Sequence, residues 1–308
     1  MTDAQIEQLY LPPYLAALEA RLTARFPYFA KIVSKRFDEF GSPWINDFEA
    51  ELRAFFSGDI AALDKATDGY GVFALDAMKL QKRFDKERQY IAKSYADVAD
   101  AVYHSHTYMF DLYLPGILLS QFLWHHHYQQ LRFFRERFVP AARAIDAKLF
   151  YDVGVGTGFY SKEMLQALPE ARGIGCDISE HSLAHTNRML ERHRLQANYE
   201  SRRLDILSAN LEQVDCIVSV EVLEHLEDPT SFLRALHGML RTGGVGYITA
   251  AINAPNADHI YLYRSGEEVL REIEAAGFKI LQHEEYFGYV PRAGETAPSG
   301  GVFIVTKE

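Results

Sequence analysis

Apolar residues recur at helical spacing throughout residues 1–147. Leu15, Leu18 and Leu22 lie three and four residues apart, which places them on one face of a helix. Further apolar clusters follow, and strand-like alternation is scarce. Residues typical of turns separate the segments: Pro12-Pro13, Pro27, Gly41-Ser42-Pro43 and Asp68-Gly69. The pattern predicts an all-helical module of six or seven helices over residues 1–147.

From Lys148 the pattern changes to alternating strands and helices. Apolar runs predict strands at 149–153, 173–177, 199–204, 216–220 and 245–251. Helical segments lie between them, at 157–167, from 180 to about 193, and from 229 onward. Residues 278–286 and 302–306 complete the pattern as an antiparallel closing hairpin. Residues 148–308 are therefore predicted to form an α/β domain, a Rossmann-like, seven-stranded, mostly parallel sheet with helices on both faces.

Two helix starts have capping signals. Asp228-Pro229 offers an N-cap carboxylate followed by proline at the first helical position, and this helix is expected to stop at Gly243-Gly244. Ser265-Gly-Glu-Glu268 has the spacing of a capping box and opens the last helix.

Composition narrows the class of partner. The formal net charge of −10 disfavours a nucleic-acid substrate, because phosphate contacts require Lys or Arg. The two cysteines, Cys176 and Cys216, lie in apolar runs and imply no disulfide framework. The N-terminus shows no secretory signal, and the longest apolar stretch, 109–124, is too short to span a bilayer. We expect a cytoplasmic protein with a small-molecule substrate and no membrane partner; the sequence does not indicate an oligomeric state.

The strongest motif is the glycine turn Asp152-Val-Gly154-Val-Gly156-Thr-Gly158, between the first strand and the first helix of the sheet. Glycines there let the backbone turn tightly and approach a ligand. The dinucleotide fingerprint would require glycine at Phe159, and the Asp152 carboxylate would face a pyrophosphate. A phosphate-free ligand carrying an ammonium and a sulfonium instead benefits from that acid. The turn therefore favours S-adenosylmethionine (SAM) over NAD.

Further acids follow at successive strand ends. Asp177, with Ile178 beside it, ends the second strand, where a carboxylate accepts hydrogen bonds from ribose hydroxyls. Asp205 and Ile206 follow the third strand, where they are placed to meet the adenine amino group and ring face.

These segments resemble a known family. The motifs DVGVGTG, GCDIS, RRLDIL and VEVLEHLEDP resemble those of class I SAM-dependent methyltransferases, the last one the ubiquinone-type O-methyltransferase group in particular. The resemblance covers about 160 residues and implies that Gly154, Gly156 and Gly158 cradle the cofactor, while Asp177 holds ribose and Asp205 contacts adenine. It also implies that the helical module covers the acceptor, as a lid.

Candidate catalytic residues follow the fourth and fifth strands. His225 is a candidate general base that Glu224 or Glu221 could orient, and Glu221 is also assigned to the cofactor site. The loop after the fifth strand is polar and aromatic, as at functional edges. Within it, His259 is assigned a catalytic role, and acceptor contact is assigned to Asn253, Tyr261 and Tyr263.

Five of the 12 histidines lie in two segments of the helical module, 103–108 and 124–128. Tyr108 is a candidate catalytic residue and His126 a candidate substrate ligand. Three consecutive histidines on a helix point about 100° apart and cannot share one pocket. No metal-ligand spacing is recognisable there, so no metal is predicted, and polar lining of a cavity is favoured.

The sequence predicts a SAM-dependent methyltransferase for a small acceptor, such as a specialised metabolite or an amino-acid-like compound. An alternative is a SAM-consuming cyclase or lyase, in which the SAM amine attacks its own aminobutyrate chain and methylthioadenosine leaves. A third possibility is a SAM-binding protein without catalysis.

Overall fold

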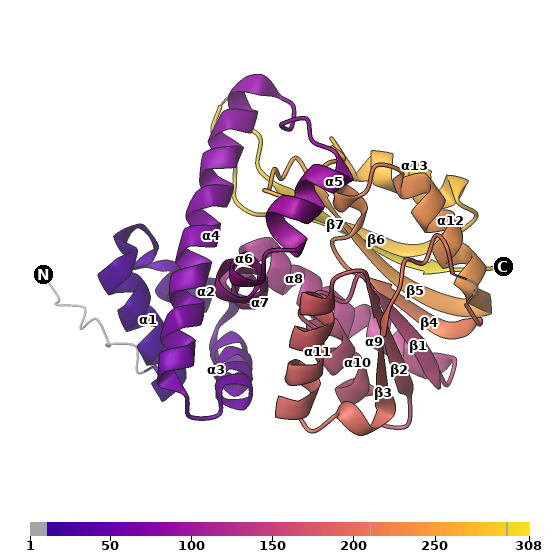
Figure 1. The fold of residues 1–308 in the computed structure, drawn as a ribbon, viewed down its shortest axis with the longest axis horizontal. Helices are drawn as coiled ribbons and strands as arrows, with labels where there is room; N and C mark the ends of the chain where they lie inside the picture. The colour runs from indigo at the N-terminus through magenta and orange to yellow at the C-terminus, as the bar shows by residue number, and fades with distance from the viewer. Residues whose placement is uncertain (1–10, 210, 294) are drawn as a thin grey trace, which may run out of the picture.

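The computed structural model describes residues 11–209, 211–293 and 295–308. Two predictions concern the N-terminus, namely that the helical pattern begins near residue 2 and that no secretory signal is present. Both fall on residues 1–10, outside the described residues. The helical half lies beside the sheet. Within it, the long helix α4 lies between α1 and the sheet domain in the view of Figure 1. Its helices are α1 Pro13–Arg25, α2 Ile32–Phe40, α3 Ser42–Phe56, α4 Ile60–Glu87, α5 Tyr95–Val98, α6 His106–Tyr108, α7 Leu114–Leu123, α8 His125–Phe133 and α9 Val139–Ala144.

Several of these helices join through π-helical turns. The segments 95–103, 106–123 and 125–144 are each unbroken, so the described part of the module has seven continuous helices and one short 3-10 turn. The prediction of six or seven helices is confirmed. The predicted turn at Asp68-Gly69 is wrong, because both residues lie inside α4. A Cβ on Gly69 would lie 2.2 Å from the carbonyl oxygen of Asp111, so this glycine permits close helix packing.

The sheet has seven strands in the order β3-β2-β1-β4-β5-β7-β6. The strands β1 to β5 are parallel to one another, and β7 pairs antiparallel with both β5 and β6. The predicted mostly parallel sheet and antiparallel closing hairpin are confirmed. The strands are β1 Leu149–Val153, β2 Arg172–Asp177, β3 Tyr199–Arg203, β4 Val214–Ser219, β5 Leu240–Ile252, β6 Lys279–Phe287 and β7 Ser299–Thr306. The helices beside them are α10 Phe159–Ala167, α11 Glu180–Arg192, α12 Pro229–Met239 and α13 Gly266–Ala275.

The helix caps agree with the sequence more closely than the helix ends do. Asp228 caps α12 by accepting from the Ser231 N–H at 3.0 Å, as predicted. The predicted stop of this helix at Gly243-Gly244 is wrong, because α12 ends at Met239 and β5 begins at once. The glycines lie in an irregular part of β5, where pairing with β4 shifts between Val214 and Cys216.

The capping box at the start of α13 is only half formed. The Ser265 hydroxyl accepts from the Glu268 N–H, as the spacing predicts. The Glu268 carboxylate, however, accepts from the Arg264 N–H at 2.7 Å, one residue before the N-cap.

The two faces of the sheet belong to different cores. On one face, Ile217, Ile248 and Val305 pack with α12 and α13. On the other, Phe150 and Tyr247 pack with α10, α11 and the helix 125–144, and this core continues into α1, α3 and α4. The boundary predicted at residue 147 stays a prediction, since one apolar core runs across it.

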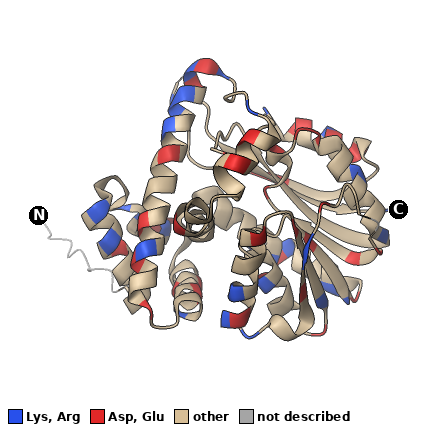
Figure 2. Ribbon diagram, viewed as in Figure 1, with Lys and Arg blue, Asp and Glu red and all other residues tan. Residues whose placement is uncertain are grey.

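Three further observations concern composition. Cys176 and Cys216 are buried and free, as expected from their strands. Within the described part of the chain, none of the helices is both long and apolar enough to traverse a bilayer. Figure 2 shows Lys and Arg interspersed with Asp and Glu along the outer helices.

Candidate functional site

The glycine turn joins β1 to α10 and has the backbone that its sequence requires. Gly154, Gly156 and Gly158 have φ angles of +73°, +53° and +76°, a region that residues with a Cβ rarely adopt. A Cβ on Gly158 would lie 2.8 Å from Thr186, so this glycine brings α10 and α11 together. Gly154 and Gly156 line a cavity, whereas Gly158 does not.

That cavity has a volume of about 1130 Å³ and extends from the carboxyl ends of the strands into the helical module. Six lining residues at the strand end were predicted cofactor contacts: Asp152, Gly154, Gly156, Asp177, Ile178 and Glu221. Ligands of parallel α/β sheets bind at this edge. The tertiary structure thus brings residues from β1, β2 and the segment after β4 together on one side of the cavity. We call this side the acid wall, after Asp152, Asp177 and Glu221.

Two carboxylates dominate this wall, the buried Asp152 and the half-buried Asp177. Asp152 accepts from the Ser161 hydroxyl at 2.6 Å, and burial raises its pKa to about 7. Asp177 accepts from the Gly156 N–H at 3.1 Å and the Ser179 N–H at 2.8 Å, and burial raises its pKa too. Asp177 therefore connects the glycine turn to the end of β2, the position expected of the ribose-binding acid.

The predicted adenine contacts do not line the cavity. Asp205 is exposed and accepts from the Leu207 N–H at 2.9 Å. Ile206 is buried in the core under α12 and α13. Asp205 does lie close enough to the cavity-lining Tyr95 to contribute, after burial and Asp177, to raising that residue's pKa. The adenine assignment stays a prediction.

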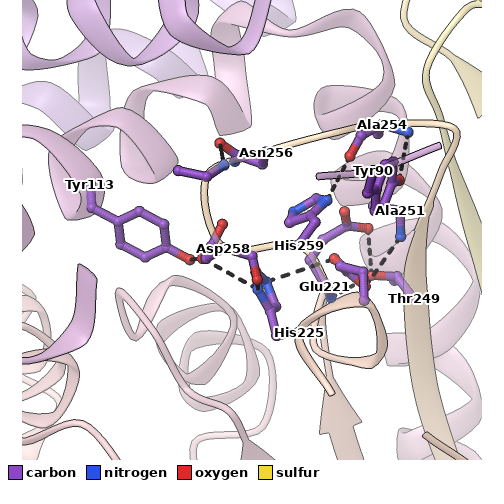
Figure 3. A network of polar contacts seen from close by, with 12 residues as sticks. Tyr90, Tyr113, Glu221, His225, Thr249, Ala251, Ala254, Asn256, Asp258 and His259 are labelled. Atoms are coloured by element: carbon purple, nitrogen blue, oxygen red, sulfur yellow. Dashed lines mark hydrogen bonds and ion pairs between the residues drawn. The ribbon is translucent and has the colours of Figure 1, made fainter. Parts of the chain in front are cut away.

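His225 and His259 both line the cavity, and their rings lie 4.9 Å apart, nearly perpendicular (Figure 3). His225 Nδ1 lies 3.2 Å from both Asp258 Oδ2 and the Asp258 carbonyl oxygen. Since these oxygens only accept, Nδ1 carries the proton and Nε2 keeps a free lone pair. His259 Nδ1 likewise donates to the Ala254 carbonyl at 2.6 Å, and burial lowers the pKa of His259 to about 3.

Asp258 organises this histidine pair and was missed by sequence reasoning. Burial opposes its ionisation, but His225 and His259 outweigh burial and lower its pKa. The hydroxyls of Tyr103 and Tyr113, both lining the cavity, donate to Asp258 Oδ2. Figure 3 shows the Tyr113 contact. The sequence held no signal for these contacts, because Asp258 and the tyrosines lie 155 and 145 residues apart. Tyr108, the predicted catalytic tyrosine, is half-buried and does not line the cavity.

A possible metal site lies in the same place. One donor atom each from Glu224, His225 and His259 lies within 4.8 Å of the others. Glu224 Oε1 is buried without a hydrogen-bond partner, and both histidines are oriented through Nδ1 by protein oxygens. Two neutral imidazoles and one carboxylate suit a divalent transition metal. In each histidine Nδ1 donates to a carbonyl oxygen, which leaves Nε2 as the ligand atom, as is usual for histidines that bind metals. The sequence predicted no metal, which stays a prediction, and no local spacing in it indicated this cluster.

The predicted acceptor contacts separate into two groups. His126 is buried and lines the cavity. Asn253, Tyr261 and Tyr263 do not: the Asn253 amide donates to the Arg264 carbonyl, Tyr261 is exposed, and the buried Tyr263 donates to Glu272 at 2.6 Å. Other residues of the same loop line the cavity in their place: Ala254, Pro255, Asn256 and His259.

The sheet, the glycine turn and the acid wall define a SAM-binding Rossmann-like domain, and comparison with known proteins agrees. Residues 151–245 match the family model described as "Methyltransferase domain". The chain is 30% identical over 146 residues to the ubiquinone biosynthesis O-methyltransferase of Ruegeria pomeroyi, a match covering 46% of this chain and 58% of that protein. The protein of the same description from Parvibaculum lavamentivorans is 29% identical over 152 residues, covering 49% and 52%. The chain thus spans a little over half the length of these relatives.

Solved structures share the fold. Mitomycin 7-O-methyltransferase MmcR superposes with a TM-score of 0.55 at 12% identity, covering 80% of this chain and 72% of that one. Coclaurine N-methyltransferase, bound to N-methylheliamine and S-adenosylhomocysteine (SAH), gives 0.54 at 12% identity, covering 77% and 89%. Residues 151–245 therefore lie in a SAM-dependent methyltransferase domain on a Rossmann-like sheet.

Proposed function

We propose that the protein transfers the methyl group of SAM to a small-molecule acceptor held between the strand edge and the helical module. The observation that carries this proposal is one continuous cavity, of about 1130 Å³, joining the acid wall to the helices. Ligand pockets for one drug-sized molecule span about 300–1000 Å³, so this cavity has room for SAM and a second molecule.

The acid wall supports the orientation of the cofactor. Asp177 is placed to accept from the ribose hydroxyls, and Asp152 lies beside the turn where the ammonium end of SAM would pass. The sulfonium would then face the aromatic and imidazole groups of the cavity, where ring faces stabilise a cation. The positioning of donor and acceptor supplies much of the rate in such a displacement.

The histidine pair supports a role in proton removal. The acceptor nucleophile attacks the methyl carbon, the carbon–sulfur bond breaks with its electron pair going to sulfur, and SAH is released. His225 Nε2, with Nδ1 held by Asp258, can take the acceptor proton as a general base does. The acceptors we favour are specialised metabolites or amino-acid-like compounds.

The test is to incubate the purified protein with SAM, with and without a panel of phenol, amine and amino-acid acceptors, and to identify the nucleoside by mass. We expect SAH that forms only with an acceptor, and less of it from His225→Ala protein that still binds SAM. Methylthioadenosine formed from SAM alone would instead establish the cyclase or lyase reaction. SAM binding without either product would leave a binding protein.

A further inference from the structure

The cavity has opposite charges at its two ends. The acids Asp152, Asp177 and Glu221 lie at the strand end, where the cationic cofactor is assigned. The other end, bounded by α2, α4 and residues 288–292 and 295–298, has five basic residues and two acidic ones. The basic residues are Lys31, Lys35, Arg36, Lys82 and Arg292, and the acidic ones are Asp85 and Glu295. This gradient would orient an acceptor with its anionic group away from SAM.

Arg36 is the buried member of this basic end. It is 5% exposed, whereas Lys31 and Lys35 on the same helical segment are exposed. Its Nη1 pairs with Glu39, which also accepts from His125 Nδ1 at 2.9 Å. That pairing fixes the guanidinium plane, but Nε is buried and makes no hydrogen bond. A buried donor without an acceptor destabilises the ligand-free protein, and a bound ligand that accepts from it would remove that cost.

Two further buried polar groups lie with Arg36 on the cavity wall. Tyr70 is fully buried beside the Trp124 side chain, and no group accepts from its hydroxyl. His126 is 7% exposed, and its Nδ1 has no hydrogen-bond partner. The ring of Trp124 stacks on that of His126 at 5.7 Å and also interacts with Tyr70, so this indole links the two groups. Burial raises the pKa of Tyr70 and lowers that of His126, and the charge of Arg36 contributes to both shifts. Gly288 lies close to the His126 ring: a Cβ at this position would be 3.2 Å from His126 Nδ1.

A carboxylate matches this arrangement. It has acceptors only, and a guanidinium can offer it two parallel N–H donors. The neutral tyrosine adds a hydroxyl donor, and a neutral imidazole can donate from either nitrogen once its tautomer is set. The single charge of Arg36, partly balanced by Glu39, suits a monoanion better than a phosphate dianion.

We propose that the acceptor carries a carboxylate bound by Arg36, Tyr70 and His126, with its reactive atom directed toward the strand end. The proposal rests on the proposed function for the identity of the ligand as an acceptor. The binding site itself can be tested without turnover. In this proposal Arg36, on the helical module, determines which acceptors bind.

The experiment measures binding to full-length, SAH-loaded protein by calorimetry, with 3-phenylpropionate and its neutral amide as paired probes. We expect the acid to bind at least about tenfold more tightly than the amide, a preference worth about 1.4 kcal/mol. Arg36→Gln should remove the preference and leave SAH affinity unchanged. Tyr70→Phe, which keeps the ring, should reduce it about threefold. Lys79→Gln, at an exposed lysine of α4 that does not line the cavity, serves as the control with little effect.

Each other result overturns the proposal. Equal binding of acid and amide, or a preference that survives both Arg36→Gln and Tyr70→Phe, would exclude a carboxylate site here. Tighter binding of phenyl phosphate than of 3-phenylpropionate would assign the site to phosphate. If Arg36→Gln does not fold, Tyr70→Phe decides. Failure of methyl transfer with every acceptor would instead affect the proposed function and leave the binding result standing.

Discussion

Lys162 of α10 and Glu51 of α3 form a buried ion pair, with Nζ 2.7 Å from Oε2, that joins the helical module to the sheet domain. The two side chains are 2% and 6% exposed. Lys162 also lies 2.7 Å from Glu163, which pairs with Arg135, and His193 lies 3.2 Å from Glu51. Lys162 is the charge that the two buried carboxylates share, and without it only His193 and Arg135 remain to balance Glu51 and Glu163.

We therefore predict that Lys162→Met lowers the free energy of unfolding by about 3–5 kcal/mol, the usual cost of breaking a buried ion pair. Denaturant titration measures it. Lys79→Met, which removes an exposed pair with Asp76, should change stability by no more than about 0.5 kcal/mol. Equal effects of the two substitutions would contradict this account.

The same cluster predicts acid sensitivity. Burial opposes ionisation of Glu163, but Lys162 and Arg135 outweigh it and lower its pKa to about 2. A depressed carboxyl pKa stabilises the folded state above the unfolded pKa of 4.5, and this contribution is lost as pH falls toward 2. Unfolding free energy measured between pH 5 and pH 2 should fall less steeply in Glu163→Gln than in wild type.

Asp152 predicts the opposite dependence. Because burial raises its pKa to about 7, the ligand-free protein should lose stability as pH rises from about 4 to 7, by roughly 4 kcal/mol if the full shift is expressed. SAM affinity should increase over the upper part of this range as the carboxylate ionises beside the cationic ligand. Asp152→Asn should flatten both dependences in melting and calorimetry experiments. A wild-type SAM affinity that does not change with pH would argue against contact with this acid.

For the ribose site, Asp177→Ala should weaken SAM binding by at least about a hundredfold, since two hydrogen bonds to a charged acceptor are lost. Asp205→Ala, measured beside it, tests the adenine assignment, where loss of one hydrogen bond should cost about tenfold. Unchanged affinity in either variant removes the corresponding assignment.

The cluster of Glu224, His225 and His259 offers a second use of the same nitrogen, because a metal held there would occupy His225 Nε2 and exclude it as the base. Elemental analysis and calorimetry with Zn²⁺ and Mn²⁺ decide between the two uses, and an ion bound at the cluster should be lost in both Glu224→Gln and His259→Ala. His283→Ala, which removes an exposed histidine of β6, is the matched control. Metal retained by both cluster variants would place the ion elsewhere.

Much of the sheet domain is determined by the sequence alone. The run from Leu149 to Val153 and the cap Asp228-Pro229 depend on short-range rules, namely apolar periodicity and N-terminal capping. The glycine turn could be predicted equally well, because residues other than glycine rarely adopt its positive φ angles. The ligand-facing positions of Asp152 and Asp177 then follow from the geometry of parallel strand ends.

Tertiary packing decided the rest. Asp68-Gly69 has the composition of a turn, yet it lies within α4, because the missing Cβ admits the Asp111 carbonyl. Tyr263 was expected to contact the acceptor but is buried against Glu272, while Tyr103 and Tyr113 reach Asp258 from a distant helical segment. Sequence patterns report local conformation and burial, whereas contacts over more than a hundred residues depend on how complete helices pack. For that reason the cofactor edge could be predicted, whereas at the acceptor end of the cavity His126 was predicted and Arg36 and Tyr70 were not.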